Sequence, residues 1–201
     1  MKVLKILSDI GFSNSYLISN GCNGFLIDCA EQSVYDICKN LNIKIEAVLL
    51  THGHFDHVGG CKKFYDNGVE IICGEKEKNL IFSSQYLGIF GGVTVPHFKI
   101  AKTVSDGDTL HLSGLRVKVL ETSGHSEGSV CYLIDNFLFS GDTLFCGNIG
   151  RCDLPTGNYS KLLNSLSKLG SLDGNFKIYC GHGEDTTLDY ERKFNGYMRN
   201  L

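Results

Sequence analysis

The segment from Thr51 to His57 holds the residue types that most clearly indicate chemistry. It reads THGHFDH, so three imidazoles and one carboxylate lie within six residues, directly after a continuous apolar run. In an extended stretch, residues two apart point the same way, so His52 and His54 can bind one ion. A turn after them brings Asp56 and His57 toward another ion. Because imidazole and carboxylate are ligands of divalent metal ions, the segment predicts a metal site.

Further candidate ligands follow apolar runs later in the chain. They are His125 in SGHSEGS, Asp142 in SGDTLF and His182 in CGHG, with Asp185 as a weaker candidate. An α/β sheet presents such side chains along the edge where its strands end. One of these histidines alone would be interpreted as an ordinary polar residue. Together with the first motif, the set provides five histidines and two aspartates, enough for two ions that share a carboxylate and keep positions open for water.

The two remaining histidines are assigned to no metal. His97 follows Pro96 in an irregular stretch, and His111 alternates with Leu110 and Leu112. Such alternation on a strand predicts that the His111 side chain faces solvent.

The elements around these loops have the order of an α/β protein. Strands are predicted over 3–7, 15–19, 24–30, 45–52 and 69–74, with helices from 33 and over 61–66. A second series follows, with strands over 109–112, 115–122, 129–135, 137–142 and 177–183, a helix over 161–169 and a helical tail. Two packed sheets with helices outside fit this order, in a single domain over residues 1–201.

Residues 75–105 form the least regular part of the sequence. The stretch begins with the charged run EKEK and contains Phe82, Tyr86 and Phe90. We interpret it as a partly helical excursion over the active face. The aromatic side chains suit a substrate lid or an oligomer contact, and core packing is the interpretation that we favour.

Composition restricts the class of protein and its partners. The chain has 201 residues, of which 42% are hydrophobic and 20% charged, as in a folded globular protein. The net charge of −3 offers no basic field for nucleic acid. No apolar run approaches the length of a membrane span, and the apolar start meets Asp9 too early for a signal peptide, so we expect a cytoplasmic protein. Nine cysteines without a Cys-x-x-Cys pair predict mostly reduced thiols.

Four motifs, THGHFDHVGG, SGHSEGS, SGDTLF and CGHG, resemble those of the metallo-β-lactamase fold superfamily. The resemblance is closest to its glyoxalase II (hydroxyacylglutathione hydrolase) branch, in the short bacterial form that lacks a C-terminal helical domain. It implies a four-layer αββα sandwich with a dinuclear metal site at the sheet edges. It also implies the ligand sets: His52, His54 and His125 for the first ion, Asp56, His57 and His182 for the second, and Asp142 between them. Zinc is the favoured metal, with iron and manganese as alternatives.

The same resemblance marks the residues expected to contact substrate. Arg151, in the stretch GRCDLP, stands where larger glyoxalase II enzymes have a substrate-binding lysine. Its guanidinium suits a substrate carboxylate, although a plain surface arginine is an equal alternative. Glu184 stands where those enzymes have a tyrosine. The chain ends soon after His182, so we expect most of their glutathione-binding residues to be absent.

These observations predict a metal-dependent hydrolase for a small-molecule thioester of the S-2-hydroxyacylglutathione type. A hydroxide that bridges the two ions would attack the acyl carbon, with Asp56 orienting it, and a thiolate would leave with little need for an acid. The first alternative is a persulfide dioxygenase, in which His52, His125 and Asp142 hold one iron. A lactonase or another ester hydrolase is the next. A structural metal module or redox sensor is disfavoured, because structural zinc sites are closed and usually rich in cysteine.

Overall fold

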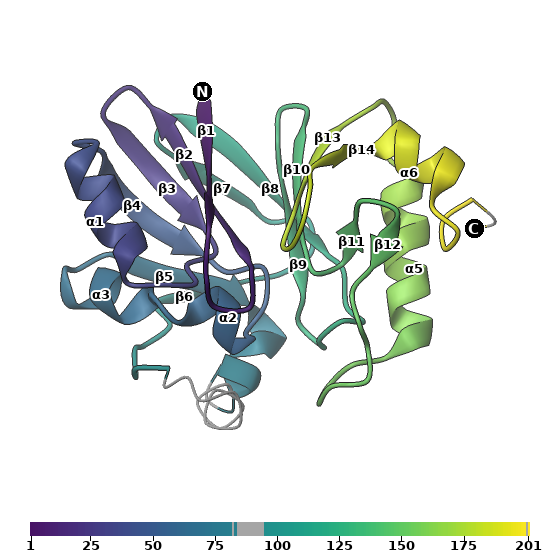
Figure 1. The fold of residues 1–201 in the computed structure, drawn as a ribbon, viewed down its shortest axis with the longest axis horizontal. Helices are drawn as coiled ribbons and strands as arrows, with labels where there is room; N and C mark the ends of the chain where they lie inside the picture. The colour runs from purple at the N-terminus through teal and green to yellow at the C-terminus, as the bar shows by residue number, and fades with distance from the viewer. Residues whose placement is uncertain (82, 84–94, 200) are drawn as a thin grey trace.

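Two six-stranded sheets pack against each other in the computed structural model, which describes residues 1–81, 83, 95–199 and 201 (Figure 1). The first sheet contains, in spatial order, β1 (Lys2–Leu7), β2 (Asn14–Asn20), β3 (Asn23–Ile27), β4 (Lys44–Leu49), β5 (Glu70–Gly74) and β6 (Lys102–Val104). The second contains β14 (Thr186–Thr187), β13 (Lys177–Cys180), β10 (Phe137–Gly141), β9 (Val130–Ile134), β8 (Leu115–Glu121) and β7 (Thr109–Leu112). A short hairpin of β11 (Leu144–Phe145) and β12 (Asn148–Ile149) follows β10.

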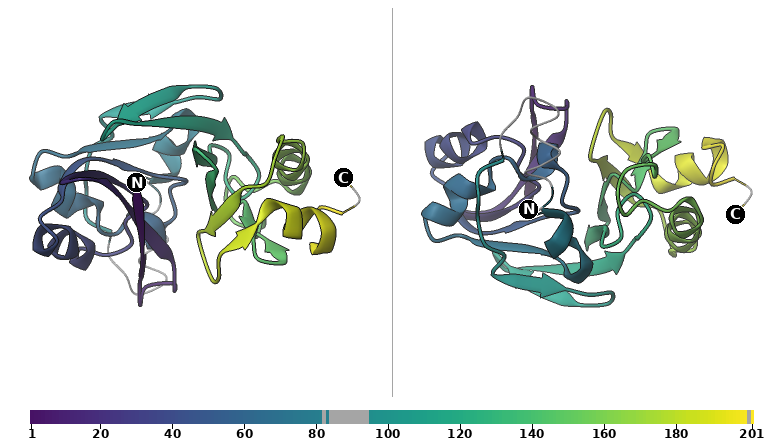
Figure 2. Two further views of the ribbon diagram at one scale, coloured as in Figure 1. Left: turned by 90° about the horizontal axis from the view of Figure 1, so that it is seen from above. Right: turned by 90° about the horizontal axis from the view of Figure 1, so that it is seen from below.

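Helices cover the outer face of each sheet, as the views along the sheets show (Figure 2). The first sheet is covered by α1 (Ser33–Asn40) and α3 (Cys61–Asp66), and the short α2 (Phe55–Val58) precedes α3. The second sheet is covered by α5 (Tyr159–Gly170) and α6 (Leu188–Phe194). A 3₁₀ helix, η1 (Glu75–Glu77), follows β5 of the first sheet. The predicted αββα sandwich is therefore confirmed. None of the described helices is long and apolar enough to cross a membrane.

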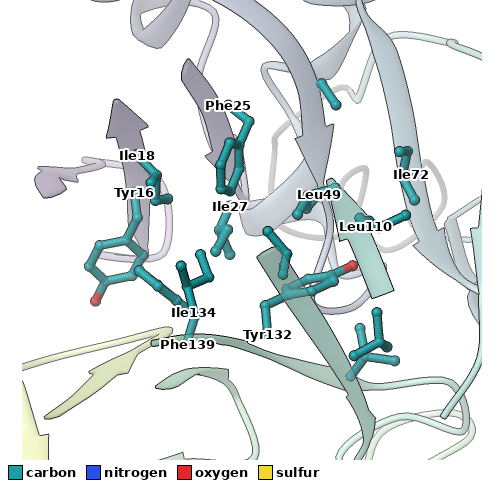
Figure 3. Close-up of a cluster of buried hydrophobic side chains, with 14 of the residues drawn as sticks. Tyr16, Ile18, Phe25, Ile27, Leu49, Ile72, Leu110, Tyr132, Ile134 and Phe139 are labelled. Atoms are coloured by element: carbon teal, nitrogen blue, oxygen red, sulfur yellow. The ribbon is translucent and has the colours of Figure 1, made fainter. Parts of the chain in front are cut away.

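The alternation of side chains along the strands produces separate cores. On β2, Tyr16 and Ile18 point between the sheets, whereas Leu17 points toward the helices. Tyr16 meets Phe139 of the opposite sheet edge to face, with ring centroids 5.4 Å apart (Figure 3). Burial of each such large side chain contributes about 1.5–3 kcal/mol. The apolar contacts between the sheets thus fix how the two sheet edges meet.

The strand directions bring several loops to one edge of the sandwich. Strand β9 is antiparallel to both β8 and β10, and β13 is parallel to β10, so β8, β10 and β13 all end on the same side. Val130 donates its N–H to the carbonyl of Thr51 at 2.9 Å, and Asn14 donates to Gly181 at 2.7 Å. These hydrogen bonds join the two sheets at the edge where the candidate ligands follow the strands.

Some boundaries differ from those predicted. The strands predicted over 24–30 and 45–52 end at Ile27 and Leu49, because the residues after these points turn into the loops of the site. Strand β6 lies in the stretch predicted to be irregular and pairs with β5. The aromatic residues Phe82, Tyr86 and Phe90, considered above as a lid or core segment, lie outside the described residues.

Candidate metal centre

The first group of candidate ligands consists of three buried histidines. His52 and His54 follow β4, and His125 lies in the loop after β8. One ring nitrogen of each lies within 4.8 Å of those of the other two. The closest pair is His54 Nδ1 and His125 Nε2, at 2.8 Å. We call these residues the three-histidine group.

The second group mixes imidazole with carboxylate. Asp56 and His57 belong to α2, and His182 follows β13. Their ligand atoms also lie within 4.8 Å of one another. His182 Nε2 is 3.2 Å from His57 Nε2 and 3.4 Å from Asp56 Oδ2. We call these residues the mixed group.

Asp142 lies between the two groups. Its Oδ2 is 3.5 Å from Nε2 of His125 and 3.3 Å from Nε2 of His182, and its Oδ1 is 3.4 Å from Nε2 of His57. A glycine at position 181 allows this placement, since a Cβ there would lie 2.1 Å from Asp142 Oδ1. All seven residues predicted as ligands therefore meet at one place.

Four of the five histidines are oriented by a hydrogen bond at Nδ1, the ring nitrogen that faces away from the cluster. Nδ1 of His57 lies 2.9 Å from Asp28 Oδ2, and Nδ1 of His125 lies 2.6 Å from the carbonyl oxygen of Arg151. The other two pairs are His52 Nδ1 with Thr51 Oγ1 at 3.0 Å and His182 Nδ1 with the carbonyl oxygen of Phe12 at 3.3 Å. An acceptor at Nδ1 favours the tautomer with its proton there, which leaves Nε2 free to bind a cation.

Asp28 is a functional residue that the sequence analysis missed. It is 2% exposed and follows β3 with a φ of +58°. Its oxygens accept hydrogen bonds from Thr51 N and Thr51 Oγ1, each at 2.8 Å, as well as facing His57. Although Asp28 is close enough to His52 and His57 to form a third ligand group, these donors occupy both of its oxygens. We therefore interpret Asp28 as orienting the ligands.

The electrostatic environments of the two groups are opposite. Burial lowers the pKa of His52 well below its usual value and that of His54 to about 3. Burial also acts to lower the pKa of His57, but the carboxylates of Asp142, Asp56 and Asp28 outweigh it and raise that pKa to about 10. The pKa of His182 is raised in the same way, since Asp142 outweighs the burial.

Asp142 has the complementary shift. Burial alone would raise its pKa, but the imidazoles of His57, His182 and His52 hold it well below the usual value of an aspartate. The carboxylate at the centre of the site is therefore ionised.

These side chains fit two cations. Among the described residues, His52 Nε2 and Asp142 Oδ1 are buried without a hydrogen-bond partner, although both face the cluster. An unpaired polar atom in such a position is costly unless an ion or a proton satisfies it. Two pairs of ring nitrogens, His54 with His125 and His57 with His182, lie 2.8 Å and 3.2 Å apart, so a cation bound between them would take the place of a shared proton. Imidazole and carboxylate donors with no thiolate suit zinc, iron or manganese.

The other candidates lie apart from the cluster. Asp185 forms ion pairs with Lys5 at 3.2 Å and Lys177 at 3.4 Å. Arg151 has a side chain that is 62% exposed, and its Nε and one terminal nitrogen bind the two oxygens of Asp153. Its carbonyl, rather than its guanidinium, contacts a candidate ligand. His97 and His111 are both exposed, the latter as predicted.

Comparisons with known proteins agree with this geometry. A family model described as the metallo-beta-lactamase superfamily matches residues 8–182. The hydroxyacylglutathione hydrolase GloC of Haemophilus influenzae is 32% identical over 169 residues, which cover 81% of this chain and 80% of that protein.

Solved structures show the same fold over nearly the whole chain. The crystal structure of TTHA1623 in a di-iron-bound form has a TM-score of 0.88 at 29% identity and covers 97% of this chain and 100% of the other. The crystal structure of BLEG-1 B3 metallo-beta-lactamase has a TM-score of 0.88 at 28% identity and covers 98% and 99%. The chain belongs to the metallo-β-lactamase superfamily, which confirms the resemblance of its motifs, and its histidine and aspartate cluster is that of a metal-dependent hydrolase.

Proposed function

We propose that this protein hydrolyses a thioester of the S-2-hydroxyacylglutathione type with two divalent metal ions, most suitably zinc. The three-histidine group would hold one ion, the mixed group the other, and Asp142 would contact both. The observation that carries this proposal is the position of Asp142, whose two oxygens lie 3.3–3.5 Å from ligand nitrogens of both groups. The similarity to a hydroxyacylglutathione hydrolase supports the choice of substrate.

When bound, two such ions lower the pKa of a coordinated water to about 7 and stabilise negative charge on a carbonyl oxygen. The protein supplies the orientation. Asp56 Oδ2 faces the cluster beside His182 Nε2, where it can accept a hydrogen bond from an attacking water and direct it toward the acyl carbon. A thiolate leaves readily because its conjugate thiol has a pKa of about 8.5, so no separate acid is required.

Arg151 is the proposed contact for a substrate carboxylate. Its carbonyl receives the Nδ1 proton of His125, so the residue is fixed beside the three-histidine group while its side chain extends into solvent. The bidentate pair with Asp153 already engages the guanidinium. A substrate anion must compete with that carboxylate, so we expect Arg151 to affect substrate affinity only modestly.

The main alternative is a persulfide dioxygenase with one iron on His52, His125 and Asp142. In such a site the mixed group would have no metal to bind. The orientation of His57 by Asp28 and of His182 by Phe12 favours the dinuclear hydrolase, since both contacts direct Nε2 toward the cluster. A lactonase or another ester hydrolase remains a further alternative, and the similarity to BLEG-1 B3 metallo-beta-lactamase adds a β-lactam to the substrates to be compared.

The test is a substrate panel on purified protein loaded with zinc, and separately with iron. The panel contains S-D-lactoylglutathione, a neutral acyl thioester, a lactone and a β-lactam, and oxygen uptake is recorded with glutathione persulfide. We expect hydrolysis of the thioesters to exceed that of the lactone and the β-lactam, without oxygen uptake. Oxygen uptake by the iron form at one ion per chain, without thioesterase activity, would establish the dioxygenase instead.

A further inference from the structure

Glu77 is a buried carboxylate outside the ligand groups. Glu77 is the last residue of η1, the 3₁₀ helix that directly follows β5, and it is 0% exposed. Its Oε2 accepts a hydrogen bond from the backbone N–H of Gly53 at 2.8 Å. Its Oε1 accepts from Ser126 Oγ at 2.5 Å and from the backbone N–H of Gly128 at 2.8 Å. A charge that is removed from water in this way requires several donors, and these hydrogen bonds supply them.

The donors belong to the two loops that carry the three-histidine group. Gly53 lies between His52 and His54, and Ser126 follows His125 directly. One oxygen of Glu77 therefore holds the loop after β4, and the other holds the loop after β8.

The two loops also approach the Glu77 residue too closely for side chains larger than hydrogen. A Cβ at Gly53 would lie 2.9 Å from Glu77 Oε2, and a Cβ at Gly128 would lie 2.6 Å from the Glu77 backbone nitrogen. Contacts at these distances are tighter than ordinary van der Waals packing. The position of Glu77 therefore determines how near the two loops stand to each other.

The hydrogen-bond pattern requires a carboxylate rather than an amide. All the donors named above point toward Glu77, so both of its side-chain oxygens act as acceptors. A glutamine has the same shape but only one oxygen, and its NH₂ group would face an N–H or O–H donor. Burial raises the pKa of Glu77, and its hydrogen bonds to Ser126, Gly128 and Gly53 act against that shift.

We propose that Glu77 is a positioning residue that holds the His52–His54 loop and the His125 loop at the separation needed for the first metal ion. This inference rests on the proposed function for the identity of the three ligands. Because Glu77 contacts neither the mixed group nor Asp142 in the described structure, its effect is selective. Loss of one of its two acceptor oxygens should lower the affinity of the three-histidine group for its ion and leave the affinity of the mixed group unchanged.

The test compares Glu77→Gln in two backgrounds, with zinc as the probe and a chromophoric chelator as competitor. In His182→Ala protein, in which the mixed group is broken, we expect Glu77→Gln to weaken zinc binding by about 10–100-fold, as for other residues that orient metal ligands. In His54→Ala protein, in which the three-histidine group is broken, the same change should alter zinc affinity by less than about twofold. Equal weakening in both backgrounds, or none in the first, would overturn the inference.

Glu191→Gln is the matched control. Glu191 is also 0% exposed and accepts hydrogen bonds on both oxygens, from Gly147 N, Thr186 Oγ1 and Asn195 Nδ2, none of which belongs to the ligand loops of the three-histidine group. We expect Glu191→Gln to lower the melting temperature to a similar degree without weakening zinc binding in the His182→Ala background. Similar weakening by both substitutions would assign the effect of Glu77 to general destabilisation and overturn the inference.

Ser126→Ala keeps the test decisive if Glu77→Gln does not fold. This substitution removes one donor and leaves the carboxylate in place, so it should weaken zinc binding severalfold in the same background, and unchanged binding would overturn the inference. Failure of the proposed function has a separate signature. A wild-type protein that binds two zinc ions but cleaves no thioester would refute the substrate, while the Glu77 comparison would still measure positioning.

Discussion

The two ligand groups are alike in size and opposite in chemistry. The three-histidine group contains no carboxylate, and burial lowers the pKa values of His52 and His54. In the mixed group, neighbouring carboxylates raise the pKa values of His57 and His182. His52 and His54 of the first group are therefore neutral imidazoles, whereas His57 of the second group holds a proton that a cation has to displace. One site thus contains two positions with different proton balances, joined by the ionised carboxylate of Asp142.

The two groups share Asp142, and its removal should have the largest effect on the site. Asp142→Ala should lower thioester hydrolysis by at least about 10²–10³-fold, a loss typical of removing a central electrostatic group. The variant should also bind fewer than two ions. Turnover and metal analysis of the purified variant measure both effects. Asp185→Ala is the control, since that carboxylate pairs with lysines outside the cluster and should retain both ions. An Asp142→Ala protein with two ions and full turnover would refute the shared role.

The orienting residue of the mixed group provides the next test. Asp28→Asn should weaken binding of the ion on this group by about 10–100-fold, because an amide cannot accept all of the hydrogen bonds that Asp28 receives from Thr51 and His57. Competition with a chelator in the His54→Ala background measures this affinity. The control is Asp108→Asn, which changes an exposed carboxylate that accepts a hydrogen bond from Ser105 N and should leave the zinc affinity unaltered. Equal affinities for Asp28→Asn and its parent would show that Asp28 does not orient the group.

The proton balance of the two groups predicts different pH dependences. The pKa of His57 is raised to about 10, so this imidazole is protonated between pH 6 and 8 and must lose its proton to bind zinc. Affinity of the mixed group should therefore fall about tenfold for each unit by which the pH is lowered in this window. The pKa of His54 is about 3 and that of His52 is also lowered, so these two imidazoles should add no pH dependence to zinc binding by the three-histidine group over the same window.

Calorimetric zinc titrations in buffers of different ionisation enthalpy measure these proton counts directly. We expect His54→Ala protein, with the mixed group intact, to release about one proton or more per zinc ion at pH 7. His182→Ala protein, with the three-histidine group intact, should release fewer protons, because His52 and His54 bind zinc without losing one. Equal release by the two variants would remove the distinction between the groups.

The smallest expected effect concerns substrate contact beside the three-histidine group. Arg151→Ala should raise KM for a carboxylate-bearing thioester by about two- to fivefold with little change in kcat, because its guanidinium is exposed and paired with Asp153. A neutral thioester provides the control and should show no change. Asp153→Asn should act in the opposite direction by releasing the guanidinium. A large fall in kcat for Arg151→Ala would instead indicate that the change disturbs the His125 contact.

The parts of the fold and site that could be predicted share a local signal. Alternating apolar residues such as Tyr16 and Ile18 predicted strands, and each ligand cluster followed a strand end, which predicted that the ligands meet at a sheet edge. The polar loops gave less information about where strands stop, so the strand predicted over 45–52 ends at Leu49. The loop after that strand was predicted as a turn, and the structure shows that Asp56 and His57 lie on a helical turn.

The residues that support the ligands could not be found in this way, because their roles depend on contacts distant in sequence. Asp28 lies within GFLIDCA and was included in a predicted strand, although an aspartate in so apolar a run could have been recognised as a buried charge. Glu77 belongs to the run EKEK, a pattern typical of a solvent-exposed face, yet its side chain is fully buried. Its donors lie 24, 49 and 51 positions away, and only the folded chain brings them together.

The proposed dinuclear hydrolase is tested most directly by a stoichiometric titration of metal-free protein with zinc, in which hydrolysis of S-D-lactoylglutathione is followed at each addition. We expect little activity at one ion per chain and a rise to full activity as the second ion binds. Full hydrolytic activity at one ion per chain, with no further change at two, would exclude a reaction that needs both ions.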